Sequence, residues 1–338
     1  MTFKKNILII GALVMSFLVH AQDPHFSQFF ASPLTLNPAF TGKFDGVFRL
    51  AVNHRDQWPS IPKAYVTTSA SADFGILANK LSETDVLGVG FSGVSDQSAN
   101  NALKLNFGSM SLSYHKAMDD DGFQTLGVGF QGTYSSMMID QTKLTFEDQL
   151  TQNGFTGVTN EILTNGTKQN YFDLNAGVLY SGSSDGINNY YIGVSAYHIN
   201  QPFVGFIDQF WRLSPRYTLH GGGSYPINDK LALHGSAILQ FQNNASETTF
   251  GAAVAKNLNG DNDVVSPTNL YLGAWMRFKD ALIPYAGLEF KNMRLGISYD
   301  VNISSLKAAT QSRGGGEFSL IYIKPRAEKG KDLPCPKF

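Results

Sequence analysis

Histidine and serine side chains on two neighbouring segments are the first candidates for chemistry in this sequence. His220 and His234 are expected on the polar faces of adjacent strands, with Ser224 or Ser236 near them. A serine hydrolase needs a serine, a histidine and an orienting acid within hydrogen-bond reach of one another. The seven histidines of the chain are scattered, and no such constellation is recognisable. We therefore expect a protein without enzymatic activity.

Two acidic turns could instead offer oxygen ligands to calcium. They are Asp119-Asp120-Asp121-Gly122 and Asp261-Asn262-Asp263. Neither has the spacing of an EF-hand loop with its closing glutamate. Acidic turns with glycine are also common for conformational reasons alone. We expect no bound metal and no cofactor.

The elements that must position these residues are short runs of alternating hydrophobicity. Between Thr125 and Tyr134, the apolar residues Leu126, Val128 and Phe130 alternate with small or polar ones. This is typical of a strand with one apolar and one polar face. Each run has about ten residues, the length that a tilted strand needs to cross the hydrocarbon layer. The runs predict fourteen strands, near 46–54, 65–74, 85–94, 107–116, 125–135, 170–181, 189–198, 216–225, 230–241, 247–256, 268–278, 282–290, 294–302 and 316–323.

The chain begins with the features of a secretory signal. Lys4 and Lys5 precede the apolar stretch Ile7–Val19 and a small-residue cleavage site at Ala21. We expect residues 1–21 to be removed. No later segment is long and apolar enough to cross a membrane as a helix. Export and fourteen strands together predict an all-β fold, a closed antiparallel transmembrane β-barrel over residues 46–323 in the outer membrane, surrounded by its lipid.

The composition agrees with a barrel. Only 16% of the residues are charged, against roughly 25% in globular domains, which suits an outer face that meets lipid. A net charge of -1 gives no electrostatic basis for binding nucleic acid.

An even number of strands places both chain ends on one side, which we expect to be the periplasm. Residues 324–338 then form a periplasmic tail. Its Cys335 cannot form a disulfide within the chain, and is either reduced or linked to another chain. Long loops face outwards in such barrels, and the longest connections fall on the expected external list, which is 55–64, 95–106, 136–169, 199–215, 242–246, 279–281 and 303–315.

Charged residues that alternate with apolar ones are expected to face the lumen. A Lys or Arg side chain in the middle of the lipid layer costs about 2–4 kcal/mol, and both signs are present, so we expect pairing inside the barrel. A role in reading a substrate is the less favoured alternative. These residues are Arg49, Asp73, Asp173, Arg277, Glu289, Arg294 and Asp300.

Residues 22–45 do not resemble a strand. Three prolines interrupt the stretch Asp23–Gly42, while four phenylalanines and two leucines in it demand burial. The segment can fold into the barrel from the periplasmic side as a plug, or it can dock a partner there. We favour the plug.

One expected external loop is unusually apolar. Gln201–Pro215 contains four aromatic residues, Phe203, Phe206, Phe210 and Trp211. It either folds inwards or offers aromatic anchors to a protein partner, since aromatic residues concentrate at the centres of interfaces. Arg55 and Trp58, in the loop after the first strand, could lie beside it.

Three stretches carry a resemblance to a known family, and they run from the start to the end of the mature chain. At one point the chain departs from the family pattern: His54 stands where members often have tyrosine. The sequence resembles the PorP/SprF family of type IX secretion system membrane proteins. The stretches are Gln22-Asp23-Pro24 with Phe26-Ser27-Gln28, Pro33-Leu34, Asn37-Pro38-Ala39 and Gly42; Asn53-His54-Arg55-Asp56-Gln57-Trp58-Pro59; and Leu333-Pro334-Cys335-Pro336-Lys337-Phe338.

The resemblance implies a non-enzymatic outer-membrane barrel that works with the type IX secretion system. The resemblance implies that some members are dedicated partners of one secreted cell-surface protein. Such a member receives the C-terminal (type B) signal domain of that protein and holds it at the surface, in some cases for gliding motility. Others attach to the periplasmic ring or to the translocon. A plugged channel for hydrophobic or small polar solutes is the alternative function, and strand patterns do not separate the two.

Overall fold

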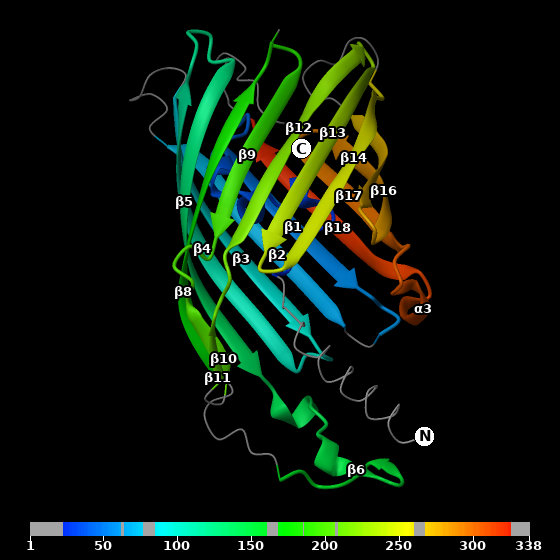
Figure 1. Cartoon of the computed structure of the whole chain (residues 1–338). Helices are drawn as coiled ribbons and strands as arrows, with labels where there is room; N and C mark the ends of the chain where they lie inside the picture. The colour runs from blue at the N-terminus through cyan, green and yellow to red at the C-terminus, as the bar shows by residue number, and fades with distance from the viewer. Residues whose placement is uncertain are drawn as a thin grey trace.

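The computed structural model describes residues 23–61, 64–76, 85–160, 168–184, 186–206, 209–259 and 268–325. Fourteen strands form one closed antiparallel barrel, which confirms the expected fold (Figure 1). Around the barrel their order is β1, β18, β17, β16, β15, β14, β13, β12, β9, β8, β5, β4, β3 and β2. Their bounds are β1 Phe48–Gln57, β2 Tyr65–Ile76, β3 Val86–Ser98, β4 Leu103–Ala117, β5 Gln124–Ile139, β8 Lys168–Gly182, β9 Asn189–Tyr197, β12 Arg216–Asn228, β13 Leu231–Gln242, β14 Ala245–Asn257, β15 Asn269–Arg277, β16 Ala281–Phe290, β17 Met293–Asn302 and β18 Arg313–Lys324.

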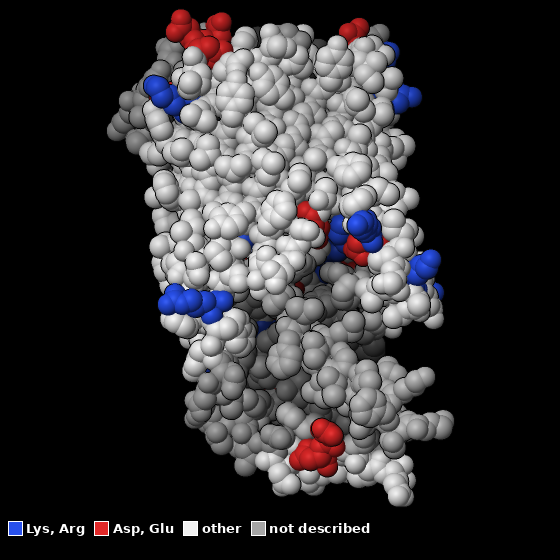
Figure 2. Space-filling view, viewed as in Figure 1, with Lys and Arg blue, Asp and Glu red and all other residues white. Residues whose placement is uncertain are grey.

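The alternation of the sequence explains which face each side chain takes. Phe130, Phe172 and Ile192 point outwards and are 66%, 54% and 54% exposed, whereas their polar sequence neighbours point into the lumen. Charged side chains gather above and below a broad uncharged band of the outer surface (Figure 2). Closure leaves no strand edge unpaired in lipid, where an unsatisfied backbone group is costly.

The two barrel openings differ. The hairpin mouth is the end at which β1 finishes and β18 begins, and the tail mouth is the end at which β1 begins and β18 finishes. Both of the longest connections, 140–167 and 198–215, open at the hairpin mouth. They carry two small hairpins outside the barrel, β6 (Leu150–Thr151) with β7 (Gly154–Phe155), and β10 (Phe203–Phe206) with β11 (Gln209–Arg212).

The wall is also uneven in height. The strands β3, β4, β5 and β8 have 13, 15, 16 and 15 residues. The strands β9, β15, β16 and β17 have only 9, 9, 10 and 10. The long strands therefore stand beyond the short ones at the hairpin mouth, on the side where β10 and β11 lie (Figure 1).

Residues 23–44, which we call the plug, fill the lumen. The plug contains three short turns, η2 (Phe29–Ala31), α2 (Pro33–Leu36) and η3 (Pro38–Phe40). Its side chains are almost all buried, with Asn37 and Ala39 at 0% exposure. Prolines at the start of α2 and η3 set their first turns, where the missing N–H costs nothing.

The path of the plug corrects one expectation. We expected it to enter from the periplasmic side, with both chain ends there. In the structure, Asp23 lies at the hairpin mouth and Phe44 near the tail mouth, so the described chain ends, Asp23 and Pro325, lie at opposite openings. The plug spans the lumen because polar wall groups bind it along its whole length. Residues 1–21 and most of the tail lie outside the described residues.

Within those described ranges, no helix is long and apolar enough to span a membrane.

Candidate functional site

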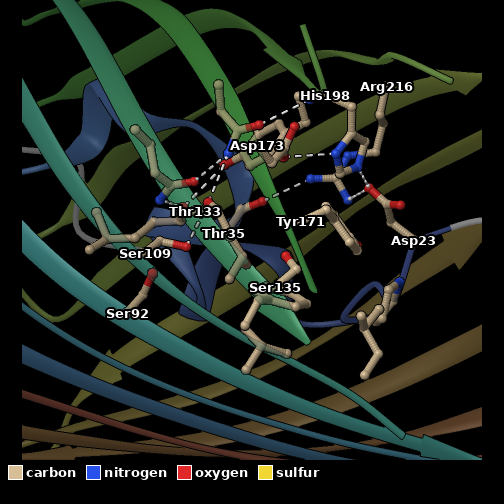
Figure 3. Close-up of a pocket in the computed structure, with 18 of the residues that line it drawn as sticks. Asp23, Thr35, Ser92, Ser109, Thr133, Ser135, Tyr171, Asp173, His198 and Arg216 are labelled. Carbon is tan, nitrogen blue, oxygen red and sulfur yellow. Dashed lines mark hydrogen bonds and ion pairs between the residues drawn. The ribbon is translucent and has the colours of Figure 1, made fainter. Parts of the chain in front are cut away.

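A chain of charged contacts holds the first residue of the plug at the hairpin mouth. His198, which follows β9, donates from Nε2 to Asp23 Oδ2 over 2.6 Å and from Nδ1 to Asp173 Oδ2 over 2.8 Å. Arg216 Nη1 lies 3.2 Å from the same Asp23 oxygen. Gln242 also donates to the carboxylate of Asp23. Figure 3 shows Asp23, Asp173, His198 and Arg216 among the residues that line the pocket between plug and wall.

The surroundings fix the protonation of this cluster. Burial disfavours a charged imidazole, but the carboxylates of Asp23 and Asp173 outweigh it and raise the pKa of His198 to about 9. Although burial opposes ionisation, His198 and Arg216 hold the pKa of Asp23 well below its usual range. Two carboxylates therefore share two cations at the hairpin mouth.

Two plug residues bind the last two strands of the barrel, β17 and β18. The carboxylate of Glu317 on β18 accepts from the backbone N–H groups of Ser27, at 2.7 Å, and Gln28, at 2.9 Å. The Gln28 amide donates to Ser298 on β17, and Ser319 on β18 donates to it over 2.6 Å. Two strands that follow the plug by about 270–290 residues in the chain are thus tied to it.

Asp300 is the charged centre of the same region. It lies on β17 and is 2% exposed. Arg55 and Arg277 donate to its carboxylate over 2.9 and 2.8 Å, and the Ser27 hydroxyl donates over 2.8 Å. Arg55 also donates to the His25 carbonyl. One buried carboxylate therefore links the plug to β1 and β15 as well.

Burial and the positive charges of Arg55 and Arg277 hold the pKa of His25 well below its usual range. Its Nε2 lies 3.1 Å from Glu247, but the geometry is not that of a hydrogen bond. The contact therefore joins a neutral ring and a carboxylate and is not an ion pair.

Around Asn37 the side-chain contacts of the plug are neutral. Asn37 donates to the carbonyls of Val178 and Val194 and bonds to His220 over 2.9 Å, while its own oxygen accepts from Ala39 N–H. The Asn37 side chain lies so close to the wall that Gly177 is required, because a Cβ there would collide with its amide group. Thr41 bonds to Ser111 over 2.8 Å.

The seven expected lumen charges all lie on the inner side of the wall with at least one partner. Arg49 pairs with Asp73 at 2.8 Å, and Asp73 also accepts from Gly42 N–H. Arg294 pairs with Glu289 at 2.9 Å. The remaining pairs are those of Asp173 with His198 and of Arg277 with Asp300.

Two expected partner-binding residues are placed differently. Arg55 is not in an external loop: β1 continues to Gln57, and the Arg55 side chain is 2% exposed inside the lumen. A residue so buried is not available to a surface partner, which corrects that assignment. Trp58 does lie in the loop, but it is half-buried and stacks edge-on against Tyr65 at 5.4 Å.

The hairpin of β10 and β11 stays outside the barrel. Phe203, Phe210 and Trp211 are 56%, 60% and 51% exposed, whereas Val204 is 3% exposed. The Gln169 side chain on β8 ties the hairpin to the long wall by donating to the Phe203 carbonyl over 3.1 Å. The backbone of Phe206 ends β10, and its side chain lies outside the described set.

A pocket lies between the plug and the long wall. Its volume is about 60 Å³, small beside the roughly 300–1,000 Å³ of sites that enclose drug-sized ligands. Phe26 and Leu34 of the plug line it with Phe107 and Tyr171 of the wall. The plug therefore leaves little open lumen on this side.

The other candidates for chemistry do not assemble. His220 bonds to the plug, whereas His234 packs against Tyr271, and the register places His220 opposite Ile238 rather than His234. Asp119 caps its own turn by accepting from Gln124 N–H. Over the described part of the chain, no cluster of metal-ligating side chains is found. The turn at 261–263 and Cys335 lie outside that part.

Comparison with known proteins agrees with this architecture. The family model described as "Type IX secretion system membrane protein PorP/SprF" matches residues 18–322. The chain belongs to the PorP/SprF family. Two of its three motif stretches now have a place: the first is the plug, and the second is the end of β1 with Arg55, which holds the plug through Asp300. The family is one of secretion-system membrane proteins.

Two solved structures resemble this PorP/SprF member in fold. The Pseudomonas putida toluene transporter TodX is 10% identical with a TM-score of 0.51, over 86% of this chain and 92% of that one. A Pseudomonas aeruginosa FadL homologue is 9% identical with a TM-score of 0.47, over 88% and 93%. At such identities the likeness concerns the fold alone. No curated protein matches the chain.

Sequence reasoning missed three residues of the plug site: His198, Arg216 and Glu317. Glu317 alternates with apolar neighbours, as the seven expected charges do, so the same signal could have found it. His198 directly follows the last residue of β9, where alternation no longer predicts a direction.

Proposed function

We propose that this protein is an outer-membrane partner of type IX secretion that binds the C-terminal (type B) signal domain of a secreted protein. It assists export of that protein and anchors it at the cell surface, in some settings for gliding motility. The hairpin of β10 and β11 is the docking site. The single observation that carries the proposal is its exposed aromatic surface outside the barrel wall, made by Phe203, Phe210 and Trp211.

The position of the hairpin supports this assignment. Both of the longest connections open at the hairpin mouth, and long loops face outwards in outer-membrane barrels. We therefore assign the hairpin mouth to the cell surface. Family membership supports a role alongside other secretion components.

The plug weighs against the alternative of a solute channel. It occupies the lumen from one mouth to the other and is held by a partly buried charge at Asp23 and a buried one at Asp300. The remaining pocket of about 60 Å³ leaves no room for a drug-sized solute unless the plug moves. The buried plug is also not an open docking surface for a periplasmic partner.

The test is affinity isolation of the tagged barrel from detergent-solubilised outer membranes, followed by mass spectrometry. The variant changes Phe203, Phe210 and Trp211 to Ser. Losing one central aromatic anchor costs about 2 kcal/mol or more of binding, so a co-isolated secreted protein with a C-terminal signal domain should fall at least about tenfold in yield. Heat-modifiable migration on gels reports a folded barrel.

A matched control changes Tyr225 and Ile227 to Ser. These side chains are 63% and 55% exposed near the tail mouth, so their loss should leave the yield unchanged. Equal yields from the hairpin variant and wild type would reject the hairpin as the docking site. Loss with the control alone would move the site to the tail mouth and favour attachment to the periplasmic ring.

A further inference from the structure

The hydrogen-bonded ladder between β16 and β17 is interrupted after its first two residue pairs at the hairpin mouth. Pairing stops after Leu282 with Val301 and resumes in the same register at Tyr285 with Ser298. Two positions of each strand, including Pro284, therefore have no partner in this ladder. Among the barrel ladders formed by the described residues, no other lacks consecutive interior pairs.

Proline accounts for the break. Pro284 has no backbone N–H to donate, which is why proline is rare within sheets, and its side chain faces outwards. The next ladder is irregular at the same height, because the register between β17 and β18 shifts between Asp300 and Val301. Unpaired backbone groups are costly in lipid, so the wall is weak on both sides of Asp300.

The plug covers this weak wall from inside and contacts both of its edges. On one edge, Ser27 and Gln28 bind Asp300 and Ser298 of β17. On the other edge, Phe30 packs edge-on against Tyr285 of β16, with ring centroids 5.5 Å apart. The plug thus bridges the two strands where their own ladder does not.

An apolar cluster lies behind the β16 side of the break, whereas Asp300 with Arg55 and Arg277 lines the β17 side. The rings of Phe30, Trp275 and Tyr285 pack within 4.8–5.5 Å of one another, and Trp275 is 3% exposed. A gap between β16 and β17 would connect these rings with the hydrocarbon layer. A flexible hydrocarbon chain is the ligand that suits both a narrow slot and an aromatic lining.

We propose that the break at Pro284 is a lateral gate. It opens to the lipid layer when Ser27 and Gln28 leave β17 and β18, and it admits a lipid acyl chain to the cluster of Phe30, Trp275 and Tyr285. This inference does not depend on which protein binds the hairpin.

The test uses the tryptophan behind the gate as a reporter. Changing Trp58 and Trp211 to Phe leaves Trp275 as the one tryptophan of the chain. The full-length protein is placed in phosphatidylcholine vesicles with or without bromine on the acyl chains, which quenches tryptophan on contact. Ser27→Ala with Gln28→Ala removes side-chain contacts of the plug and leaves the wall intact. The quenched fraction should rise about twofold or more, because the interrupted ladder alone no longer closes the wall.

Two controls separate a gate from general loosening. Thr35→Ala removes plug hydrogen bonds to Ser32 away from the gate, and should leave quenching at the wild-type level. A disulfide between Ala286→Cys and Ile297→Cys, which are direct partners across the two strands, should return the quenched fraction of the double variant to that level. The disulfide is made with Cys335→Ser.

No rise in quenching with the double variant would overturn the proposal, and so would a rise that persists after the disulfide forms. If the Ser27→Ala, Gln28→Ala variant does not fold, Pro284→Val tests the gate in its place. Restoring the N–H should slow hydrogen exchange of the amides from Ser298 to Val301 about tenfold, the equivalent of one hydrogen bond. Unchanged exchange would equally overturn the gate.

Discussion

Two regions of the plug are held by different chemistry. Its first residues form a charged latch, made by Asp23, Ser27 and Gln28 with the carboxylates and cations that bind them. Asn37 and Thr41 form a neutral latch, in which they bond to backbone carbonyls and uncharged side chains. Both latches are buried, so burial does not explain the difference.

The difference matters for how the plug can move. Removing one partner of a buried ion pair leaves an uncompensated charge and costs about 3–5 kcal/mol. Removing one partner of a neutral hydrogen bond costs about 1–3 kcal/mol. We expect the charged latch to respond to pH through His198, and the neutral latch not to respond. A change of charge should therefore weaken the charged latch first.

The largest effect is expected at the centre of the charged latch. Asp300→Ala leaves the guanidinium groups of Arg55 and Arg277 without their shared carboxylate. We expect the free energy of unfolding, measured by urea titration in lipid vesicles, to fall by about 3–5 kcal/mol. Asp140→Ala is the control, since its 3.3 Å pair with Lys143 is on the surface and should contribute less than about 1 kcal/mol. Equal losses would contradict the comparison.

A second effect concerns pH at the hairpin mouth. The pKa of His198 rises from 6.5 to about 9 on folding, so the folded state binds the proton more tightly. The resulting stabilisation is complete below about pH 6.5 and is lost as the pH rises through about 9. Its size is at most about 3 kcal/mol, because one unit of pKa corresponds to 1.36 kcal/mol.

The measurement is unfolding free energy between pH 6 and pH 10, for wild type and His198→Gln. The groups that face His198 are Asp23 and Asp173, with Arg216 behind Asp23. Subtracting the two curves removes the titration of other groups. A difference that stays constant across this range would show that His198 is not the titrating part of the charged latch.

The neutral latch should give a smaller and pH-independent effect. Asn37→Ala leaves the carbonyls of Val178 and Val194 and the ring of His220 without their donor. We expect a loss of about 1–3 kcal/mol in the same urea titration. The loss should be equal at pH 6 and pH 9. A loss that changes with pH would mean that charge also acts at this end.

The sequence predicts the wall better than the contents of the lumen. All fourteen strands were expected close to their observed ranges, because alternation is imposed by lipid on one face and is visible in local stretches such as Leu126 to Phe130. The expected burial of the plug also follows from its phenylalanines. These features depend on nearby residues alone.

The contacts between plug and wall residues inside the lumen depend on the path of the plug, and no local sequence pattern predicts that path. His198 meets Asp23 across 175 positions and Glu317 meets Ser27 across 290. Arg55 was misplaced because β1 continues three residues beyond its expected end at residue 54, turning an expected loop residue into a wall residue. Long-range contacts of this kind require the closed barrel to be known first.

The smallest effect on stability is expected at the hairpin of β10 and β11, which belongs to neither latch. Changing Phe203, Phe210 and Trp211 to Ser alters side chains that are more than half exposed, and exposed substitutions usually change stability by about 0.5 kcal/mol or less. The urea midpoint should therefore match that of wild type, even where partner retention is lost. A clear fall in the midpoint would show that the hairpin braces the wall through Gln169. The barrel would then have a third, external support, and loss of binding in this variant would no longer be evidence for a docking surface alone.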